Sequence, residues 1–581
     1  MIKLLKNMRP KELIMSIICI IFILGQIYFD LSLPDYMSEL TTLINSVGSE
    51  INDIVLVGLK MIGCTLISAV LAILCGFLSS KIASGFSFEI RKKLFHHIND
   101  ISKQEMQDFS IPSLITRTTN DISQIQMLVS MGLQMLIKSP VMAIWAIIKI
   151  LNKSWELSLV TMAYVVVLCA FILIIMSICL PRFRLVQKFT DKINKVTREN
   201  LQGINVVHAF NAEDYQNNKF DDANKKMNSL QLKNQKLFAC MQPSISLCMN
   251  SLSLVIYWLG ATLINNMSSA SDRLVMFSNV VVFSTYATYV IMSFMMLIMI
   301  FMMLPSAQVS AERINEVLAK QTSIKEGSVI EGTSKGTIKF NNVYFSYPKT
   351  KEDELVNINF EVNQGETLAI IGPTGSGKTT LVNLISRLYD VTSGEVLIDG
   401  LNIKDYKFSS LYHKIGYISQ KAMLFSGSVE DNVFFGEEKN KDILNEALEI
   451  SQASEFVNKL DDKENYHVAQ LGRNLSGGQK QRLSIARAIA RHPEILIFDD
   501  SFSALDYKTD ALLREELKNK LKDTTKVIVA QRVSTIRHAD KIIVLNNGEI
   551  VGIGRHEELM KNCLLYQEIA HSQLSNTELE G

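Results

Sequence analysis

The sequence lacks an excess of charge of either sign, because 59 Lys and Arg residues stand against 58 Asp and Glu residues. Nucleic-acid-binding proteins usually carry a clear basic excess, so this balance argues against a nucleic-acid partner.

The sequence also lacks paired cysteine motifs. None of its eight cysteines falls in a Cys-x-x-Cys or Cys/His spacing, which argues against a zinc site and a disulfide framework. Seven of them lie in or near the apolar half, and we interpret them as small buried hydrophobic residues.

Long apolar runs dominate the first half of the chain, whereas the second half has the composition of a soluble α/β domain. A membrane-spanning helix needs about 20 mostly apolar residues. Six segments meet this requirement, so the sequence predicts a membrane α-helical part with six transmembrane helices. The predicted spans are Leu13–Leu33, Ile54–Leu78, Met131–Leu151, Leu157–Leu180, Met241–Leu263 and Val275–Leu304.

The orientation of these spans follows from the basic residues of the loops. The segment before the first span is basic, and the loop after it is acidic and has no Lys or Arg. The charged residues are Lys3, Lys6, Arg9 and Lys11 before the span, and Asp35, Glu39, Glu50 and Asp53 after it. Because basic residues gather on the cytoplasmic side, the N-terminus is expected in the cytoplasm, and six spans return the chain there. Frequent Lys, Asn and Ile and the lack of an organelle-targeting segment favour a bacterial plasma membrane.

Two inner connections, residues 79–130 and 181–240, are long and polar. Apolar residues recur in them at helical spacing, which favours helices that continue beyond the membrane over disordered loops.

Ionisable groups within spans are candidates for function, and among them Asp30 is our first candidate. The side chains of Lys60 and Lys138 could instead extend toward a membrane interface. The methionine-rich stretch 292–303 could line an adaptable binding surface or face lipid.

The second half contains a complete phosphate-binding loop, G-x-x-x-x-G-K-T, between the apolar strand Thr367–Ile371 and the helical run Leu381–Leu388. Backbone N–H groups of such a loop bind phosphate at a helix N-terminus, the lysine reaches the outer phosphates and the threonine hydroxyl reaches Mg²⁺. This motif predicts ATP and Mg²⁺ as cofactors of a P-loop NTPase domain. The predicted nucleotide-binding residues here are Gly372, Thr374, Gly375, Ser376, Gly377, Lys378, Thr379 and Thr380.

Three further motifs follow the phosphate-binding loop. Gln420 ends an apolar strand and could ligate Mg²⁺ through its amide oxygen, together with Thr379. Asp499 ends the buried-strand pattern Ile495–Asp499, as a Mg²⁺-holding carboxylate requires. Between them, glycines precede a helix in the sequence LSGGQ at Leu475–Gln479, which is again suited to phosphate.

These motifs resemble those of an ATP-binding cassette (ABC) exporter half-transporter, in which six spans are fused to one nucleotide-binding domain. The resemblance covers essentially the whole chain. It implies that Tyr347 stacks on adenine and that Gln420 senses the γ-phosphate. It also implies that Asp506, in the loop Ser503–Asp506, helps to link two ATP sites, and that short coupling helices lie near Pro112–Asp121 and Ala209–Glu213.

The resemblance further implies that two nucleotide-binding domains close head to tail. The LSGGQ segment of one chain then covers the ATP held by the phosphate-binding loop of the other. The residues assigned to that contact are Ser476, Gly477, Gly478 and Gln479.

At two positions the sequence departs from this family. Asp500 stands where the family usually has the glutamate that polarises the attacking water, and Gln531 stands where it usually has histidine. Aspartate is one methylene shorter, and a displacement of about 1 Å can cost roughly 10²-fold in rate. Glutamine can donate a hydrogen bond but cannot carry a proton. Both changes weaken hydrolysis and spare binding, and they resemble the degenerate-site subunit of heterodimeric multidrug-type ABC exporters.

We therefore predict a transmembrane domain at 1–320, a linker at 321–335 and an ABC nucleotide-binding domain at 336–581. The expected function is ATP-driven export of hydrophobic or amphipathic compounds (drug-like molecules, lipids or peptides) with a second, non-identical half-transporter. The partner would supply the hydrolysing glutamate and histidine. The alternative is a nucleotide-gated or regulatory membrane module, in which the weak site acts as a sensor.

Overall fold

The computed structural model describes residues 2–6, 8–45, 50–151, 153–348, 350 and 352–573. The chain forms two compact units. We name them the membrane unit (Met1–Ile98 with Ile111–Ala319) and the nucleotide unit (Asn99–Ser110 with Lys320–Gly581).

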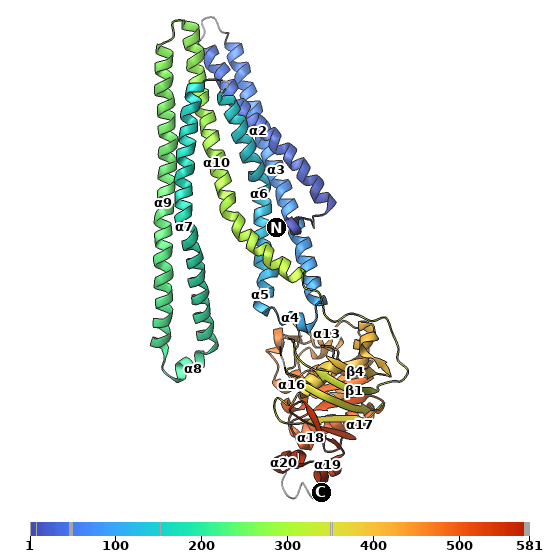
Figure 1. The fold of residues 1–581 in the computed structure, drawn as a ribbon. Coiled ribbons are helices and arrows are strands. Elements are labelled where there is room, and N and C mark those ends of the chain that lie inside the picture. Colours follow the sequence, from blue (N-terminus) through green and yellow to red (C-terminus); the bar gives the residue numbers. More distant parts are fainter. Residues whose placement is uncertain are drawn as a thin grey trace. The chain divides into compact units, whose positions relative to one another are not determined.

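The secondary-structure elements of the membrane unit are helices joined by short connections, among the residues that the structure describes (Figure 1). Six of its helices are long and apolar enough to cross a membrane, which confirms the predicted helical membrane part. The helices of this unit are α1 (Ile2–Leu5), α2 (Pro10–Asn45), α3 (Ile51–Asp100, whose last two residues belong to the nucleotide unit), α5 (Ile111–Thr116), the π-helical turn η1 (Arg117–Asp121), α6 (Ile122–Leu151), α7 (Trp155–Gln202), α8 (Ile204–Ala209), α9 (Glu213–Asn265) and α10 (Ala270–Leu318).

Four of these helices are far longer than a bilayer span: α3 has 50 residues, α7 has 48, α9 has 53 and α10 has 49. A span needs roughly 20 residues. The additional turns cover most of the two inner connections, which are therefore helical. Helix α8 is the short turn that joins α7 to α9.

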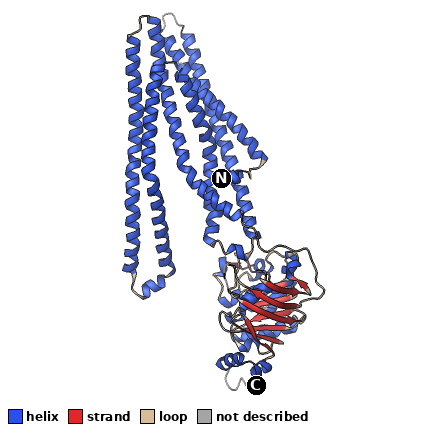
Figure 2. Cartoon of the chain, in the orientation of Figure 1, coloured by secondary structure: helices blue, strands red, loops and turns tan. Residues whose placement is uncertain are grey.

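The nucleotide unit contains two main sheets with helices packed around them (Figure 2). The six-stranded sheet has the order β12-β11-β3-β10-β9-β6, and the four-stranded sheet has the order β2-β1-β4-β5. The strands are β1 (Ile338–Phe345), β2 (Leu355–Val362), β3 (Thr367–Ile371), β4 (Ser393–Ile398), β5 (Leu401–Asn402), β6 (Ile415–Ile418), β9 (Ile495–Asp499), β10 (Thr525–Val529), β11 (Lys541–Asn546) and β12 (Glu549–Gly554), with a small pair β7 (Gly427–Ser428) and β8 (His467–Val468).

The helices of the nucleotide unit include α4, a single turn in the segment Asn99–Ser110. In chain order they are α4 (Lys103–Met106), α11 (Lys378–Ile385), α12 (Phe408–Lys414), α13 (Val429–Phe434), α14 (Lys441–Ile450), α15 (Ser454–Val457), α16 (Gly477–Ile489), α17 (Tyr507–Lys520), α18 (Val533–Ile536), α19 (His556–Asn562) and α20 (Leu564–Gln573).

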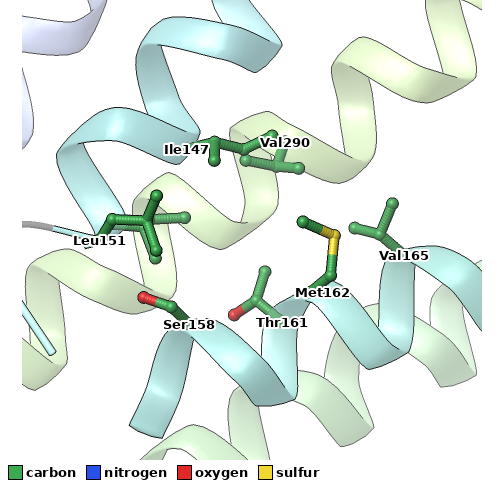
Figure 3. Close-up of a pocket in the computed structure, with 8 residues that line it drawn as sticks. Ile147, Leu151, Ser158, Thr161, Met162, Val165 and Val290 are labelled. Carbon is green, nitrogen blue, oxygen red and sulfur yellow. The ribbon is translucent and has the colours of Figure 1, made fainter. Parts of the chain in front are cut away.

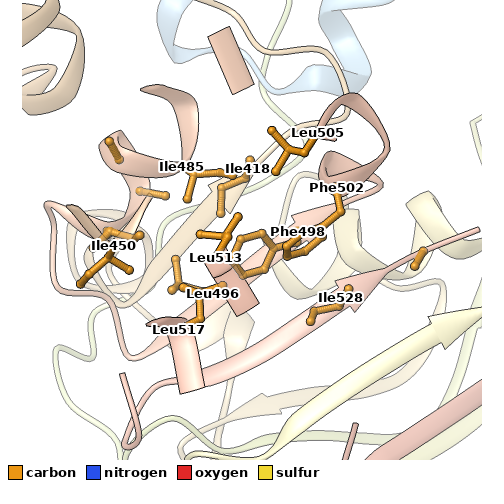
Figure 4. Packing of buried hydrophobic residues seen from close by; sticks show 14 of the residues in the cluster. Ile418, Ile450, Ile485, Leu496, Phe498, Phe502, Leu505, Leu513, Leu517 and Ile528 are labelled. Atoms are coloured by element: carbon orange, nitrogen blue, oxygen red, sulfur yellow. The ribbon is translucent and has the colours of Figure 1, made fainter. Parts of the chain in front are cut away.

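Strands β3, β10, β9 and β6 run parallel, so their carboxyl ends share one edge of the sheet. All the residues of β9 and β10 are buried, as expected for parallel strands covered on both faces. The core on one face joins Ile418, Phe498 and Ile528 of the sheet to helices such as α16 and α17 (Figure 4). This packing fixes the edge from which the motif residues project.

Candidate nucleotide-binding site

The phosphate-binding loop leaves β3 at Ile371 and enters α11 at Lys378. Gly375 and Gly377 have positive φ values of 83° and 96°, a conformation that favours glycine. A Cβ atom on Gly375 would meet nothing within 4 Å, whereas one on Gly377 would lie 2.8 Å from Leu355 Cδ2. The loop is therefore packed tightly from behind at Gly377 and open at Gly375, where a phosphate could approach the backbone.

Lys378 is folded onto its own loop. Its Nζ donates to the carbonyl oxygens of Gly372 at 2.9 Å and Pro373 at 2.6 Å. Burial lowers the pKa of this ammonium group, and the carboxylates of Asp500 and Asp499 oppose that shift. A phosphate next to the loop would give the buried cation a stronger partner than two neutral carbonyls.

Two of the three predicted metal ligands, Thr379 of α11 and Asp499 at the end of β9, are hydrogen-bonded to each other. Thr379 Oγ1 donates to Asp499 Oδ1 at 3.2 Å, and Tyr417 Oη donates to Asp499 Oδ2 at 3.0 Å. Burial raises the pKa of the Asp499 carboxyl, and these two hydrogen bonds oppose the shift. Burial and the neighbouring Asp499 also raise the pKa of Tyr417, so its phenol is a neutral donor.

This set of oxygen donors fits Mg²⁺, which binds through one or two carboxylates plus substrate phosphates and water. Thr379, Asp499 and the amide oxygen of Gln420 would hold it, and the ion would neutralise charge on the phosphates. Within the described part of the chain, no group of three or more His, Cys, Asp or Glu side chains could hold a metal. A phosphate-bound Mg²⁺ needs no such group.

Asp500 accepts hydrogen bonds from two of the predicted site glutamines, Gln420 and Gln531. Gln420 Nε2 donates to Asp500 Oδ2 at 2.9 Å, and Gln531 Nε2 donates to the same oxygen at 2.8 Å. Asp500 adopts a left-handed backbone conformation with φ 50°, which Asp tolerates better than most residues. The two positions that depart from the family pattern are therefore hydrogen-bonded to each other.

A hollow of about 240 Å³ opens between these groups. Its lining contains most of the predicted loop residues together with Gln420, Asp500 and Gln531. It also contains Glu354 and Val529, which the sequence reasoning did not identify. Glu354 directly precedes β2, and no motif spacing marks it.

Tyr347 lies beyond the end of β1, next to the phosphate-binding loop. Its Oη lies 3.0 Å from Thr380 Oγ1, and either hydroxyl could donate. The ring meets those of Phe345 and Tyr389 edge-on, with centroids 5.0 Å and 5.3 Å apart. The structure thus brings Tyr347 to Thr380 beside the loop, and its stacking on adenine stays a prediction.

The LSGGQ residues lie elsewhere in the unit. Ser476 caps α16: its Oγ accepts from Gln479 N–H at 3.3 Å, and Gln479 Oε1 accepts from Ser476 N–H at 2.9 Å. A Cβ atom on Gly477 would meet nothing within 4 Å. Asp506 caps α17 by accepting from Thr509 N–H at 3.0 Å. None of these residues, all of which the structure describes, lines the hollow of this chain.

Both predicted coupling segments coincide with or border short helices, and their coupling role stays a prediction. Pro112–Asp121 lies in the membrane unit, in α5 and η1, whereas the preceding segment Asn99–Ser110 packs within the nucleotide unit. There Gln107 Nε2 donates to Tyr389 Oη at 2.9 Å, and Lys103 Nζ donates to Asn383 Oδ1 at 3.4 Å. Tyr389 therefore contacts both this segment and Tyr347. The second segment, Ala209–Glu213, lies at the turn between α8 and α9.

In the membrane unit, Asp30 of α2 forms an ion pair with Lys138 of α6 at 3.3 Å. Ser68 of α3 donates to the other carboxylate oxygen of Asp30 at 2.5 Å. Lys138 therefore binds a partner inside the bundle instead of extending toward an interface, whereas Lys60 is exposed. The Asp30 carboxylate links three spanning helices.

A small apolar pocket lies between α6, α7 and α10 (Figure 3). Its volume of about 60 Å³ is well below the 300–1,000 Å³ typical of ligand pockets. Residues of the methionine-rich stretch 292–303 do not line it. The lining residues are Ile147, Ile150, Leu151, Ser158, Thr161, Met162, Val165 and Val290.

Six helices that could span a membrane and a complete phosphate-binding loop on one chain are features of the ABC transporter class. Comparison with family models supports this assignment: the model of the ABC transporter transmembrane region matches residues 16–294, and the model described as ABC transporter matches residues 355–503. The chain belongs to the ABC transporter family, and this membership implies ATP binding and hydrolysis coupled to transport.

Among individual relatives, the ABC transporter ATP-binding protein Rv1273c of Mycobacterium tuberculosis is 37% identical over 91% of this chain and 90% of its own. YfiB of Bacillus subtilis is 35% identical over 90% of each chain. The fold is similar to that of a bacterial Atm1-family ABC exporter with ATP bound, with a TM-score of 0.79 over 98% of this chain and 100% of that chain, at 21% identity.

Proposed function

We propose that this chain is one half of a heterodimeric ABC exporter for hydrophobic or amphipathic compounds in the bacterial cell membrane. It would bind Mg-ATP tightly at its own phosphate-binding loop and hydrolyse it poorly there. Its LSGGQ segment would complete the ATP site of a non-identical partner, which hydrolyses ATP and resets the transporter.

The observation that carries this proposal is the contact between Gln531 Nε2 and Asp500 Oδ2 at 2.8 Å, on an oxygen that also accepts from Gln420. A general base must accept a proton from water in the transition state. Here the shortened carboxylate is already held by two neutral amide donors. Gln531 cannot take the place of the base because an amide does not titrate.

The remaining nucleotide-binding residues support binding without turnover. The phosphate-binding loop is complete, and Thr379 and Asp499 are within hydrogen-bonding distance. The LSGGQ helix start is intact and capped. Two copies of this chain would form two weak sites, which favours an unlike partner with a strong one.

The test is the ATPase activity of the purified chain, alone and with the half-transporter encoded in the neighbouring reading frame. In the pair, Asp500→Asn is expected to change turnover by less than about twofold. Gly477→Asp is expected to lower it roughly 10²-fold, because it places a negative charge at the partner's phosphates. Its Cβ has open space in this chain, so the fold should tolerate it. Strong loss from Asp500→Asn and none from Gly477→Asp would reverse the assignment.

A further inference from the structure

Tyr417 lies in β6, in the apolar strand that Gln420 follows, and the sequence analysis assigned it no role. Strand β6 pairs in parallel with β9, with Tyr417 opposite Ile497 and Ile418 opposite Phe498. Side chains two residues apart on a strand project from the same face. Asp499 therefore projects on the same side as Ile497, and the long side chain of Tyr417 reaches forward to it.

The hydroxyl of Tyr417 donates to Asp499 Oδ2 at 3.0 Å, while Thr379 Oγ1 donates to Oδ1 at 3.2 Å. Asp499 itself is almost fully buried. Each oxygen of this carboxylate therefore has a separate donor. The donor to Oδ1, Thr379, belongs to the phosphate-binding loop, whereas the donor to Oδ2, Tyr417, belongs to β6.

The neighbouring carboxylate of Asp500 has its own pair of donors, Gln420 and Gln531. The two adjacent carboxylates thus share no donor. Without the phenol, Asp499 Oδ2 would lose the neutral donor that holds the carboxylate in a single orientation.

We propose that Tyr417 is a positioning residue for the metal-binding carboxylate: it holds Asp499 Oδ2 so that Oδ1, next to Thr379, faces the Mg²⁺ of bound Mg-ATP. Mg²⁺ demands near-ideal octahedral geometry, so the orientation of its single protein carboxylate matters. Outer partners of metal ligands typically contribute 10–100-fold in metal affinity. The inference concerns nucleotide binding by this chain and holds whether or not its own site hydrolyses ATP.

The test compares the full chain with Tyr417→Phe, which keeps the ring and removes only the hydroxyl. Binding of a fluorescent ATP analogue is measured against Mg²⁺ concentration and separately in EDTA. The Mg²⁺ concentration for half-maximal effect is expected to rise about 10-fold. Affinity in EDTA is expected to stay within about twofold of the native value, because the phenol does not contact the loop directly.

Two further variants make the result specific. Tyr406→Phe is the matched control, because its buried hydroxyl donates to Ile398 O at 3.0 Å, and its Mg²⁺ dependence should be native. Asp499→Asn should abolish the Mg²⁺ effect. A native Mg²⁺ dependence in Tyr417→Phe would overturn the proposal. An equal loss of affinity with Mg²⁺ and in EDTA would also overturn it, because the phenol would then only support the fold.

Discussion

At the scale of single residues, the proposed weakness of the site depends on two side chains that contact each other. Asp500 is one methylene shorter than glutamate, and Gln531 donates to it without being able to take up a proton. Restoring both residues should restore a longer base and a titratable partner. We predict that Asp500→Glu combined with Gln531→His raises the steady-state ATPase rate of the purified chain, assayed alone, by at least about 10-fold.

The gain should depend on an intact LSGGQ segment, since each copy would complete the site of the other. Adding Gly477→Asp to the double variant is the control, and it should return the rate to the native low level. A double variant that binds ATP normally but turns over no faster would show that these two residues are not the cause of slow hydrolysis.

The structure shows which residue contacts were accessible to sequence reasoning. Several site residues lie at or after the carboxyl ends of parallel strands that meet at one sheet edge. A motif and its strand context therefore predict that these residues lie close together. They are Lys378, Asp499, Asp500 and Gln531. Tyr417 gave no such signal, because a tyrosine inside an apolar strand is usually a core residue. Only the register of β6 on β9 places its hydroxyl at Asp499.

At the scale of elements, the long helices could be predicted from the sequence and the short helix α4 could not. A membrane span can be recognised in the sequence from about 20 apolar residues. Helix α4 has only four residues, which is too short for a periodic pattern of apolar residues. The sequence predicts the first coupling helix at Pro112–Asp121, where the structure has α5 and η1. The structure also packs Gln107 and Lys103 of the preceding segment against Tyr389 and Asn383, contacts that depend on tertiary structure alone.

The same scale includes the ion pair between α2 and α6. Removing one partner of a largely buried pair leaves an uncompensated charge and costs about 3 kcal/mol. We predict that Asp30→Lys lowers the thermal midpoint of the detergent-solubilised protein strongly, because two cations then meet at this position. The exchanged pair, Asp30→Lys with Lys138→Asp, should recover most of the loss.

A thermal-shift assay on the two single variants and the exchanged pair measures the coupling. Lys60→Asp is a suitable comparison, because Lys60 is exposed on α3 and its substitution should have a small effect. Recovery close to the native midpoint would identify a structural link between helices. If the exchanged pair stayed as unstable as either single variant, the ion pair itself would not be the source of the stability. Asp30 and Lys138 would then each be needed at their own position.

At the scale of the whole molecule, the membrane orientation depends on the charges of short segments. The segment before the first predicted span is basic, and residues 34–53 after that span are acidic and contain no Lys or Arg. The loop between α6 and α7 is therefore expected outside and the α8 turn inside. We predict that a cysteine at Glu156 reacts with a membrane-impermeant maleimide in intact cells, whereas one at Phe210 reacts only after permeabilisation. Phe210 is 79% exposed, so a lack of labelling in intact cells would reflect the membrane barrier and not burial.

The background should carry alanine at the native cysteines, since Cys240 is exposed. Labelling at Phe210 but not at Glu156 in intact cells would mean that the chain is inserted in the opposite orientation, with its ATP site away from cytoplasmic ATP.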